Sequence, residues 1–146
     1  MEQIVIRPME QADLPRCCQI EQYAPDPWTA QQMAEELEFS SARMFVALWQ
    51  GELAGVAAFQ LAADEATLNT ITVHPDFRQK GIAAELLKKG LSELKKQGAE
   101  CCFLEVRSQN TPARRLYEKL EFVEAGLRRG FYKNPSDDSV VMTKKL

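Results

Sequence analysis

The segment from residue 68 to residue 91, LNTITVHPDFRQKGIAAELLKKGL, constrains the fold more than any other stretch. Residues 68–73 are rich in apolar and β-branched side chains, which predicts a strand. Residues 74–76, His-Pro-Asp, end this strand, because proline cannot extend a sheet ladder and aspartate favours a turn. Apolar residues then recur at helical spacing, namely Ile82, Leu86, Leu87 and Leu91. The segment therefore predicts a strand, a short turn and a helix in direct succession.

The turn between this strand and helix, residues 78–83, is a candidate phosphate site. The first N–H groups of a helix lack intrahelical partners and lie at the positive end of the macrodipole. Gly81 and Ala83 are small enough to let a ligand approach the backbone, while Arg78 and Lys80 add positive charge. We therefore expect a phosphate or pyrophosphate here. An ordinary helix start with a solvated charged face is the alternative that this segment alone leaves open.

Length and composition narrow the class of protein. The 146 residues fit one domain, residues 1–146, with 45% hydrophobic and 27% charged side chains. The net charge of −3 argues against nucleic-acid binding as the main activity. An 18-residue apolar run is missing from the sequence, and the first ten residues, MEQIVIRPME, lack the features of a signal peptide. We expect a cytoplasmic protein without a membrane partner.

Cysteine and histidine usage disfavours metal and triad chemistry. The four cysteines form two adjacent pairs, residues 17–18 and 101–102, and neither pair has the spacing of a zinc site. One thiol of each pair is expected in the core. The single histidine, His74, precedes a proline and is interpreted as a solvated turn residue. We expect no bound metal, and a Ser-His-Asp triad or a zinc hydrolase site is disfavoured.

The rest of the chain supplies further strands and helices. Strands are expected at residues 4–8, 44–49, 53–61, 68–73, 101–106, 122–132 and 139–144. Helices are expected at residues 13–22, 29–39 and 111–120, besides the central helix, which should end at Gly98. Residues 50–52 predict a hairpin turn. The order is β-α-α-β-β-β-α-β-α-β-β, which indicates a mixed sheet with helices on its faces.

This order, with a small-residue turn after the fourth strand, resembles the GCN5-related N-acetyltransferase (GNAT) superfamily. Residues 78–83 match its motif R/Q-x-x-G-x-G/A. A second block, LEVRSQN at 104–110 followed by ARRLYEKLEF at 113–122, is similar to the bacterial ribosomal-protein-alanine N-acetyltransferases of the RimI type. Residues 27–29, 64–68 and 131–132, with the later pair 137–138, agree with that subgroup. The resemblance implies the α/β GNAT fold, a mostly antiparallel mixed sheet of about seven strands with helices on both faces.

One position departs from the family pattern. Glu121 stands where the L-G-F block usually has glycine. If this residue leaves the helix with a positive φ, glutamate costs on the order of 1 kcal/mol there. The proposed chemistry does not involve Glu121.

The resemblance implies acetyl-coenzyme A as the donor and a primary amine as the acceptor. Glu105 matches the general base, acting through a water at a strand end where burial could strengthen it, and Tyr117 matches the general acid that protonates the thiolate. An α-amino group, with a pKa of ~7.7–8.0, needs less help than a lysine at ~10.4, which favours an N-terminal acceptor. The alternatives are that Glu105 pairs with Arg107 or Arg114, and that Tyr117 is core packing.

The resemblance also assigns binding residues. The main chain of residues 71–73 would hold the pantetheine and polarise the thioester, the amides of residues 78–83 would hold the pyrophosphate, and Asn110 would bond the pantetheine. These cofactor-binding residues are Ile71, Thr72, Val73, Arg78, Gln79, Lys80, Gly81, Ile82, Ala83 and Asn110. Trp28, Phe131 and Tyr132 could line the acceptor groove, although single aromatic residues often serve as core or surface packing.

The leading hypothesis is acetylation of the N-terminal alanine of a small-subunit ribosomal protein by a monomer or weak dimer. The acidic balance suits a basic peptide, and no nucleic acid is involved directly. An acetyltransferase that acts on a lysine side chain or a small-molecule amine is the first alternative. A non-catalytic acyl-coenzyme A binding module is the second, and the presence of both Glu105 and Tyr117 argues against it. A P-loop nucleotidase is disfavoured because the sequence has no G-x-x-x-x-G-K-[ST] motif.

Overall fold

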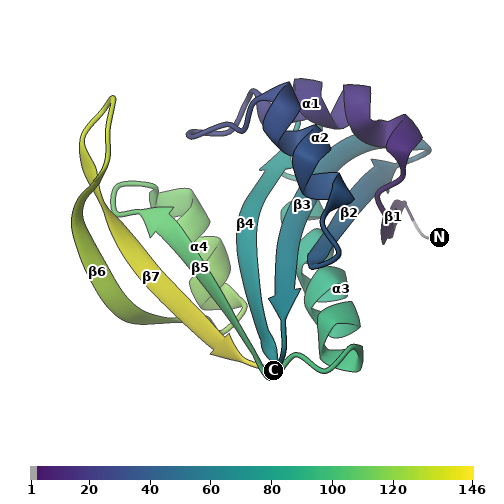
Figure 1. Ribbon diagram of the computed structural model, residues 1–146. Helices are drawn as coiled ribbons and strands as arrows, with labels where there is room; N and C mark the ends of the chain where they lie inside the picture. Colours follow the sequence, from purple (N-terminus) through teal and green to yellow (C-terminus); the bar gives the residue numbers. More distant parts are fainter. Residues whose placement is uncertain (1–2) are drawn as a thin grey trace.

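The expected succession of elements is found in the computed structural model, which describes residues 3–146 (Figure 1). The strands are β1 (Ile4–Pro8), β2 (Ala42–Trp49), β3 (Glu52–Ala62), β4 (Glu65–Val73), β5 (Cys101–Arg107), β6 (Val123–Tyr132) and β7 (Asp137–Lys145). The helices are α1 (Leu14–Glu21), α2 (Ala30–Glu38), α3 (Ile82–Lys96) and α4 (Thr111–Lys119). Short 3₁₀ turns at Gln11–Asp13 and Pro75–Phe77 precede α1 and α3. The predicted element order is confirmed.

The sheet has the strand order β1-β2-β3-β4-β5-β7-β6 and consists of two arms. All neighbouring strands pair antiparallel except β4 and β5, which run parallel. These two pair only where each begins, Glu65–Leu68 of β4 with Cys101–Leu104 of β5. Beyond these residues they diverge, so the arm β1–β4 and the arm β5–β7–β6 separate like a V (Figure 1).

A bulge in β4 marks the point of separation. Leu68 is opposite Phe59 of β3 and Thr70 is opposite Ala58, so Asn69 between them has no partner on β3. A bulge bends a strand and increases its local twist. The bend therefore lies where β4 departs from β5.

Two hydrophobic cores cover the two faces of the sheet. On one face α3 and α4 pack around fully buried side chains such as Phe59, Leu86 and Leu94. On the other face α1 and α2 bury Ile20 and Met33 against β2 and β3. Burial on both faces explains why β2 and β3 read as nearly continuous apolar runs.

Local sequence signals account for the turns. Gln50 and Gly51 both have positive φ values, 50° and 88°, and join the paired residues Trp49 and Glu52 as a two-residue hairpin turn. Gly98 ends α3 in the left-handed region with a φ of 104°. Both turns lie where the sequence predicts them.

The structure confirms the expectation for the cysteines and contradicts the one for the histidine. All four cysteines are free, and one of each pair, Cys17 and Cys102, is fully buried as expected. The expectation that His74 is solvated is wrong, because its side chain is only 14% exposed. Its ring packs edge-to-face against Tyr23, with centroids 4.9 Å apart, and its Nδ1 accepts from the N–H of Asp76.

Among the helices of residues 3–146, none is long and apolar enough to cross a membrane.

Candidate active site

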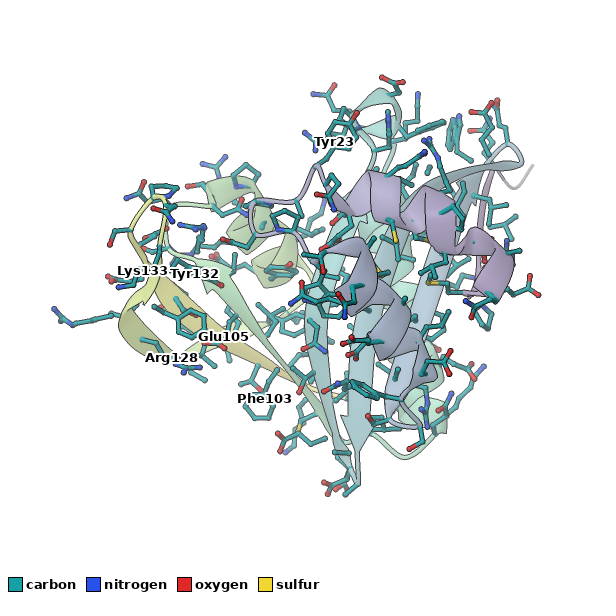
Figure 2. The ribbon with its side chains drawn as sticks, turned by 45° about the horizontal axis from the view of Figure 1, so that its top comes forward. Tyr23, Phe103, Glu105, Arg128, Tyr132 and Lys133 are labelled. Atoms are coloured by element: carbon teal, nitrogen blue, oxygen red, sulfur yellow. The ribbon has the colours of Figure 1, made fainter. Side chains whose placement is uncertain are left out.

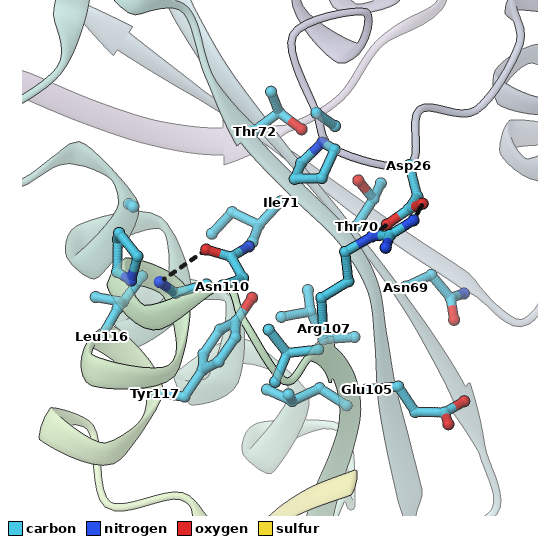
Figure 3. Close-up of a pocket in the computed structure, with 18 of the residues that line it drawn as sticks. Asp26, Asn69, Thr70, Ile71, Thr72, Glu105, Arg107, Asn110, Leu116 and Tyr117 are labelled. Carbon is cyan, nitrogen blue, oxygen red and sulfur yellow. Dashed lines mark hydrogen bonds and ion pairs between the residues drawn. The ribbon is translucent and has the colours of Figure 1, made fainter. Parts of the chain in front are cut away.

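A cavity of about 1000 Å³ occupies the space where β4 and β5 diverge. Its walls come from residues 67–73 of β4, residues 103–107 of β5, helix α4, the loop between α1 and α2, and the end of β6 (Figure 3). Because the sheet is open here, groups carried by both faces reach the same space. Most of the residues singled out in the sequence lie around this cavity.

The turn before α3 presents backbone donors. Gln79 and Gly81 both adopt positive φ values, 62° and 78°, and a Cβ added at Gly81 would meet no atom within 4 Å. Within residues 3–146, the backbone N–H groups of residues 79–83 donate to no other residue. Arg78 and Ala83 line the cavity beside them. Successive unpaired N–H groups at a helix start form an anion-binding concavity.

Two side chains of this turn face elsewhere. The Lys80 ammonium lies over the Trp49 ring, 4.9 Å from its centroid, rather than in the cavity. Ile82 is 2% exposed and belongs to the core under α3. Only the main chain of these two residues remains available to a ligand at this turn.

The edge of β4 that borders the cavity is free of strand partners. Ile71, Thr72 and Val73 line the cavity, and the pairing of β4 with β5 has already ended at Leu68. An unpaired strand edge presents N–H and C=O groups that an extended ligand can use. These three residues keep their pairing with β3 on the other side, so the edge is held rigidly.

Glu105 projects from β5 on the face opposite α4 (Figure 2). Its carboxylate accepts from Ser139 Oγ at 2.9 Å and from Arg128 Nη1 at 3.1 Å. The expected burial is wrong, because the side chain is 33% exposed. The alternative that Glu105 pairs with an arginine holds, but the partner is Arg128 rather than Arg107 or Arg114. Strand alternation and the register of β5, β7 and β6 place Glu105, Ser139 and Arg128 on the same face of the sheet.

Tyr117 projects from α4 and is 6% exposed. The end of α4 fixes it, because Phe122 N–H donates to the Tyr117 carbonyl at 2.9 Å and Glu121 N–H donates to Glu118 at 2.9 Å. This is a Schellman motif, and its usual hydrophobic contact is the packing of the Phe122 ring on Tyr117, 5.9 Å between centroids. Burial raises the pKa of Tyr117 well above its ordinary value. Its hydroxyl points into the cavity (Figure 3) and has no hydrogen-bond partner within residues 3–146.

Asn110 caps the N-terminus of α4 at the cavity wall. Its Oδ1 accepts from the N–H of Ala113 at 3.3 Å (Figure 3). The cap uses only the carbonyl oxygen of the side chain, so the amide NH₂ keeps two donors for a ligand.

Glu105 and Tyr117 reach the cavity from opposite faces of β5. Leu104 and Val106, which flank Glu105, are buried in the same core as Tyr117. Since successive residues of a strand point to opposite faces, Glu105 lies on the other side of the sheet. Both residues line the cavity because the strand edge is open between them. A molecule held at this edge can contact a carboxylate from one side and a phenol from the other.

The three aromatic residues expected at the acceptor groove all line the cavity. Trp28 is half-buried and also packs against the core under α1. Phe131 is 44% exposed, and the Arg128 guanidinium lies 4.3 Å from its centroid. Burial raises the pKa of Tyr132, with a hydrogen bond to Ser139 opposing the shift.

A buried carboxylate that sequence reasoning missed supports this end of the cavity. Glu21 is fully buried in α1, and its carboxylate accepts from the hydroxyls of Thr70 and Thr72 and from the N–H of Trp28, at 2.9–3.0 Å. A signal for it exists, because Glu21 follows Cys17 by four residues and so falls on the apolar stripe of its helix.

A second missed feature is an arginine that joins two loops, here called the Arg107 clasp. Arg107 forms a bidentate ion pair with Asp26 of the α1–α2 loop, and also donates to the carbonyls of Lys133 and Pro135 in the β6–β7 loop. Arg107 and Asp26 are 81 positions apart in the sequence, so no local pattern could have indicated their pairing.

Within residues 3–146, no group of three or more His, Cys, Asp or Glu side chains could hold a metal ion.

Comparison with known proteins agrees with this architecture. The chain is 36% identical over 140 residues to the [Ribosomal protein bS18]-alanine N-acetyltransferase of Escherichia coli K12, covering 94% of each chain. The crystal structure of the ribosomal-protein-S18-alanine N-acetyltransferase from Escherichia coli superposes with a TM-score of 0.90 at 35% identity, covering 97% of this chain and 93% of that one. Arabidopsis thaliana NAA60 in complex with acetyl-CoA shares the fold, with a TM-score of 0.86 at 20% identity and 98% coverage of both chains.

The model of the acetyltransferase (GNAT) family matches residues 11–122. These residues include the turn before α3, both strands that border the cavity and all of α4. With the identity to the Escherichia coli enzyme over nearly the whole chain, this match shows that the chain belongs to the GNAT family of acetyltransferases.

Proposed function

We propose that this chain is an N-α-acetyltransferase that moves an acetyl group from acetyl-CoA to the N-terminal alanine of a ribosomal protein of the bS18 type. The observation that carries the proposal is the joint placement of Glu105 and Tyr117 at one cavity, in a chain 36% identical to an enzyme with that activity. The family relationship supports the transfer of acetyl groups, and the similarity of the whole chain supports the acceptor.

The cavity fits acetyl-CoA along one wall. The unpaired amides of residues 79–83 would hold the pyrophosphate, with Arg78 adding charge. The free edge of residues 71–73 would pair with the extended pantetheine arm, and the Asn110 amide would donate to it. Among residues 3–146, the N–H groups of residues 79–83 and the Asn110 amide NH₂ have no other partner, whereas the Val73 carbonyl accepts from Arg78 Nε at 3.5 Å.

Glu105 is proposed as the general base. The acceptor nitrogen attacks the thioester carbonyl carbon, so a C–N bond forms as the C–S bond breaks. The proton released by the amine passes through a water to the carboxylate of Glu105. An α-amino group with a pKa of ~7.7–8.0 is partly neutral at neutral pH, so a modest base is sufficient. Ser139 and Arg128 hold the carboxylate in position and compensate its charge.

Tyr117 is proposed as the general acid. Its raised pKa keeps the phenol protonated at working pH, so its O–H can donate to the sulfur as negative charge develops there. A thiol of pKa ~8.5 is a stronger acid than tyrosine at ~10, so proton transfer to a free thiolate is uphill and depends on positioning. The Schellman motif at the end of α4 provides that positioning.

Residues 1–146 are proposed to act as one N-acetyltransferase domain, since strands from residue 4 to residue 145 pair into a single sheet. We place the enzyme in the cytoplasm as a monomer or weak dimer. Its partner would be the N-terminal peptide of the ribosomal protein rather than a nucleic acid or a membrane, in keeping with a net charge of −3.

Mass spectrometry of peptides incubated with the protein and acetyl-CoA tests the proposal. A peptide with the N-terminal sequence of bS18 should gain one acetyl group at its α-amine, and the same peptide with a blocked N-terminus should gain none. Acetylation of the blocked peptide would instead favour the lysine or small-amine alternative. If no free coenzyme A is released with any acceptor, the protein is a binding module and the proposal is wrong.

A further inference from the structure

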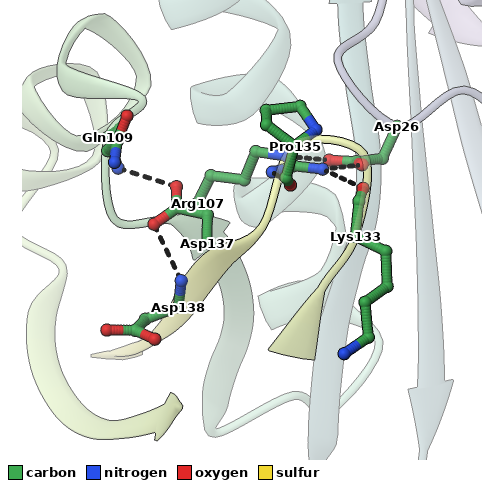
Figure 4. Close-up of polar contacts among 7 residues, drawn as sticks. All are labelled: Asp26, Arg107, Gln109, Lys133, Pro135, Asp137 and Asp138. Carbon is green, nitrogen blue, oxygen red and sulfur yellow. Dashed lines mark hydrogen bonds and ion pairs between the residues drawn. The ribbon is translucent and has the colours of Figure 1, made fainter. Parts of the chain in front are cut away.

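The open end of the V between the two sheet arms is bridged by one side chain. Arg107 Nε and Nη2 donate to the two carboxylate oxygens of Asp26 at 2.9 and 2.7 Å (Figure 4). Its Nη1 donates to the Pro135 carbonyl at 2.7 Å and its Nη2 to the Lys133 carbonyl at 3.1 Å. The guanidinium also lies 4.5 Å from the centroid of the Tyr132 ring. The Arg107 clasp therefore ties the α1–α2 loop to the β6–β7 loop.

The contact has the properties of a rigid connection. The Arg107 side chain is only 10% exposed, although it carries a full charge. Its planar group of five N–H donors matches one carboxylate and two carbonyls at once, which a lysine ammonium cannot reproduce. The hydrogen bonds that Arg107 donates to Asp26 raise the pKa of Arg107 further above its usual range, so the guanidinium stays charged.

The α1–α2 loop is also fixed to the other arm of the sheet. Trp28, two residues after Asp26, donates its N–H to the buried carboxylate of Glu21 at 3.0 Å. The same carboxylate accepts from Thr70 and Thr72 of β4. The α1–α2 loop is therefore held on one side by polar contacts to Glu21 and β4, and on the other by Arg107, which also holds the β6–β7 loop. It crosses the cavity at the end that carries the expected acceptor residues.

We propose that Arg107 is a positioning residue that sets the width of the acceptor end of the cavity and thereby the affinity for the acceptor peptide. The inference rests on the proposed function for its kinetic part, because that part needs a peptide acceptor. The turn before α3, where the donor pyrophosphate would bind, takes no part in the clasp. Loss of the clasp should therefore weaken acceptor binding and leave donor binding unchanged.

Steady-state kinetics of Asp26→Asn and Arg107→Lys test this directly. Each variant should raise the KM for the peptide about tenfold, as expected for loss of a charge-assisted bidentate contact. The KM for acetyl-CoA and kcat should stay within about twofold of wild type. The matched control is Asp13→Asn, because Arg7 and Asp13 form a bidentate pair with the same distances, 2.7 and 2.9 Å, away from the cavity. This control should leave the peptide KM unchanged.

Hydrogen–deuterium exchange tests the clasp without any acceptor. In Asp26→Asn, the hydrogen-bonded amides of Ala24 and Trp28 should exchange faster. The amides of Gln109 and Gly130, which donate to Asp137 and Asp138 directly after the β6–β7 loop, should also exchange faster, although only the first loop carries the substitution. Unchanged exchange at Gln109 and Gly130 would overturn the clasp. Wild-type peptide KM in either variant would overturn its role in acceptor binding, as would a parallel loss in both KM values, kcat and thermal stability. If wild-type protein does not acetylate the peptide, the proposed function fails, and the exchange result still decides whether the clasp exists.

Discussion

The two residues proposed for catalysis lie in opposite environments. Glu105 is partly exposed, forms an ion pair with Arg128 and accepts a hydrogen bond from Ser139. Tyr117 is buried, and its hydroxyl faces the cavity without a partner among residues 3–146. A carboxylate that is open to water suits proton uptake, whereas a phenol kept neutral by burial suits proton donation. The two roles therefore follow from the positions of the side chains on either face of β5.

Tyr117→Phe removes one oxygen and retains the ring that packs on Phe122. We expect kcat to fall by about 10²-fold or more, since general acid catalysis typically contributes 10²–10⁴-fold. Binding of acetyl-CoA, measured by calorimetry, should stay unchanged. Tyr23→Phe, which removes a hydroxyl from another wall of the same cavity at a ring that packs on His74, serves as the control and should keep full turnover. Full activity of Tyr117→Phe would remove Tyr117 from the mechanism.

Glu105→Gln keeps the shape of the side chain and removes its basicity. We expect the rate of the variant relative to wild type to be lowest below neutral pH, where an α-amine with a pKa of ~7.7–8.0 is mostly protonated. The deficit should shrink toward pH 9, because the amine then loses its proton without help. Rates of peptide acetylation from pH 6 to 9 measure this ratio. A ratio that does not change with pH would exclude Glu105 as the base.

At the scale of elements, local signals predicted the fold well. The hairpin at Gln50, the end of α3 at Gly98 and the strand–turn–helix at residues 68–91 all depend on residues close together in sequence. The divergence of β4 from β5 could not be predicted, because it follows from sheet geometry. The partners of Glu105 and Arg107 could not be predicted either, because they are distant in sequence. Arg128 is 23 positions from Glu105, and Asp26 is 81 positions from Arg107.

The end of α4 contains a residue that suits its position poorly. Glu121 has a φ of 75°, the left-handed conformation that the L-G-F pattern gives to glycine. A non-glycine residue in this conformation costs about 1 kcal/mol or more. Glycine would remove this cost, but it would also raise the conformational entropy of the unfolded chain, which offsets part of the gain. Its ion pair with Lys144, at 3.6 Å and with the Glu121 side chain 86% exposed, contributes little.

Glu121→Gly should therefore raise the free energy of unfolding by about 0.5–1 kcal/mol, or the melting temperature by a few degrees. Urea denaturation measures the change. Glu121→Ala is the control, because it removes the same ion pair and keeps the strained φ, so it should not stabilise the protein. Equal stabilisation by both substitutions would show that charge, and not backbone conformation, is the cause.

At the scale of the whole molecule, the sheet separates the proposed donor side from the proposed acceptor side. The turn proposed to bind the donor precedes α3, which packs with α4 on one face, while α1 and α2 pack on the other. The opening between β4 and β5 is the place where the two sides meet. The position of the helices on each face depends on the core beneath them. The geometry of the opening therefore requires both cores to stay packed.

Each core contains one fully buried thiol, and the pKa of that thiol depends on the core staying packed. Burial raises the pKa of Cys17, in the core under α1 and α2, and of Cys102, in the core under α3 and α4, each to about 12. An unfolded thiol titrates near ~8.5. Between these values the unfolded chain releases protons that the folded chain keeps, so stability is complete below pH 8.5 and falls as the pH rises toward 12.

We expect the free energy of unfolding to decrease in alkali by up to about 1.4 kcal/mol per pH unit for each thiol. Urea denaturation at intervals between pH 8 and 10.5 measures this slope. In the double variant Cys17→Ala, Cys102→Ala the protein should be less stable at pH 7, because two buried sulfurs are lost, but its stability should depend less on pH. Each single variant should remove a similar part of the slope, and the rest comes from other groups whose pKa values burial raises, Tyr117 among them. If the double variant keeps the wild-type slope, alkaline unfolding starts elsewhere, and the two cores do not control it through these thiols.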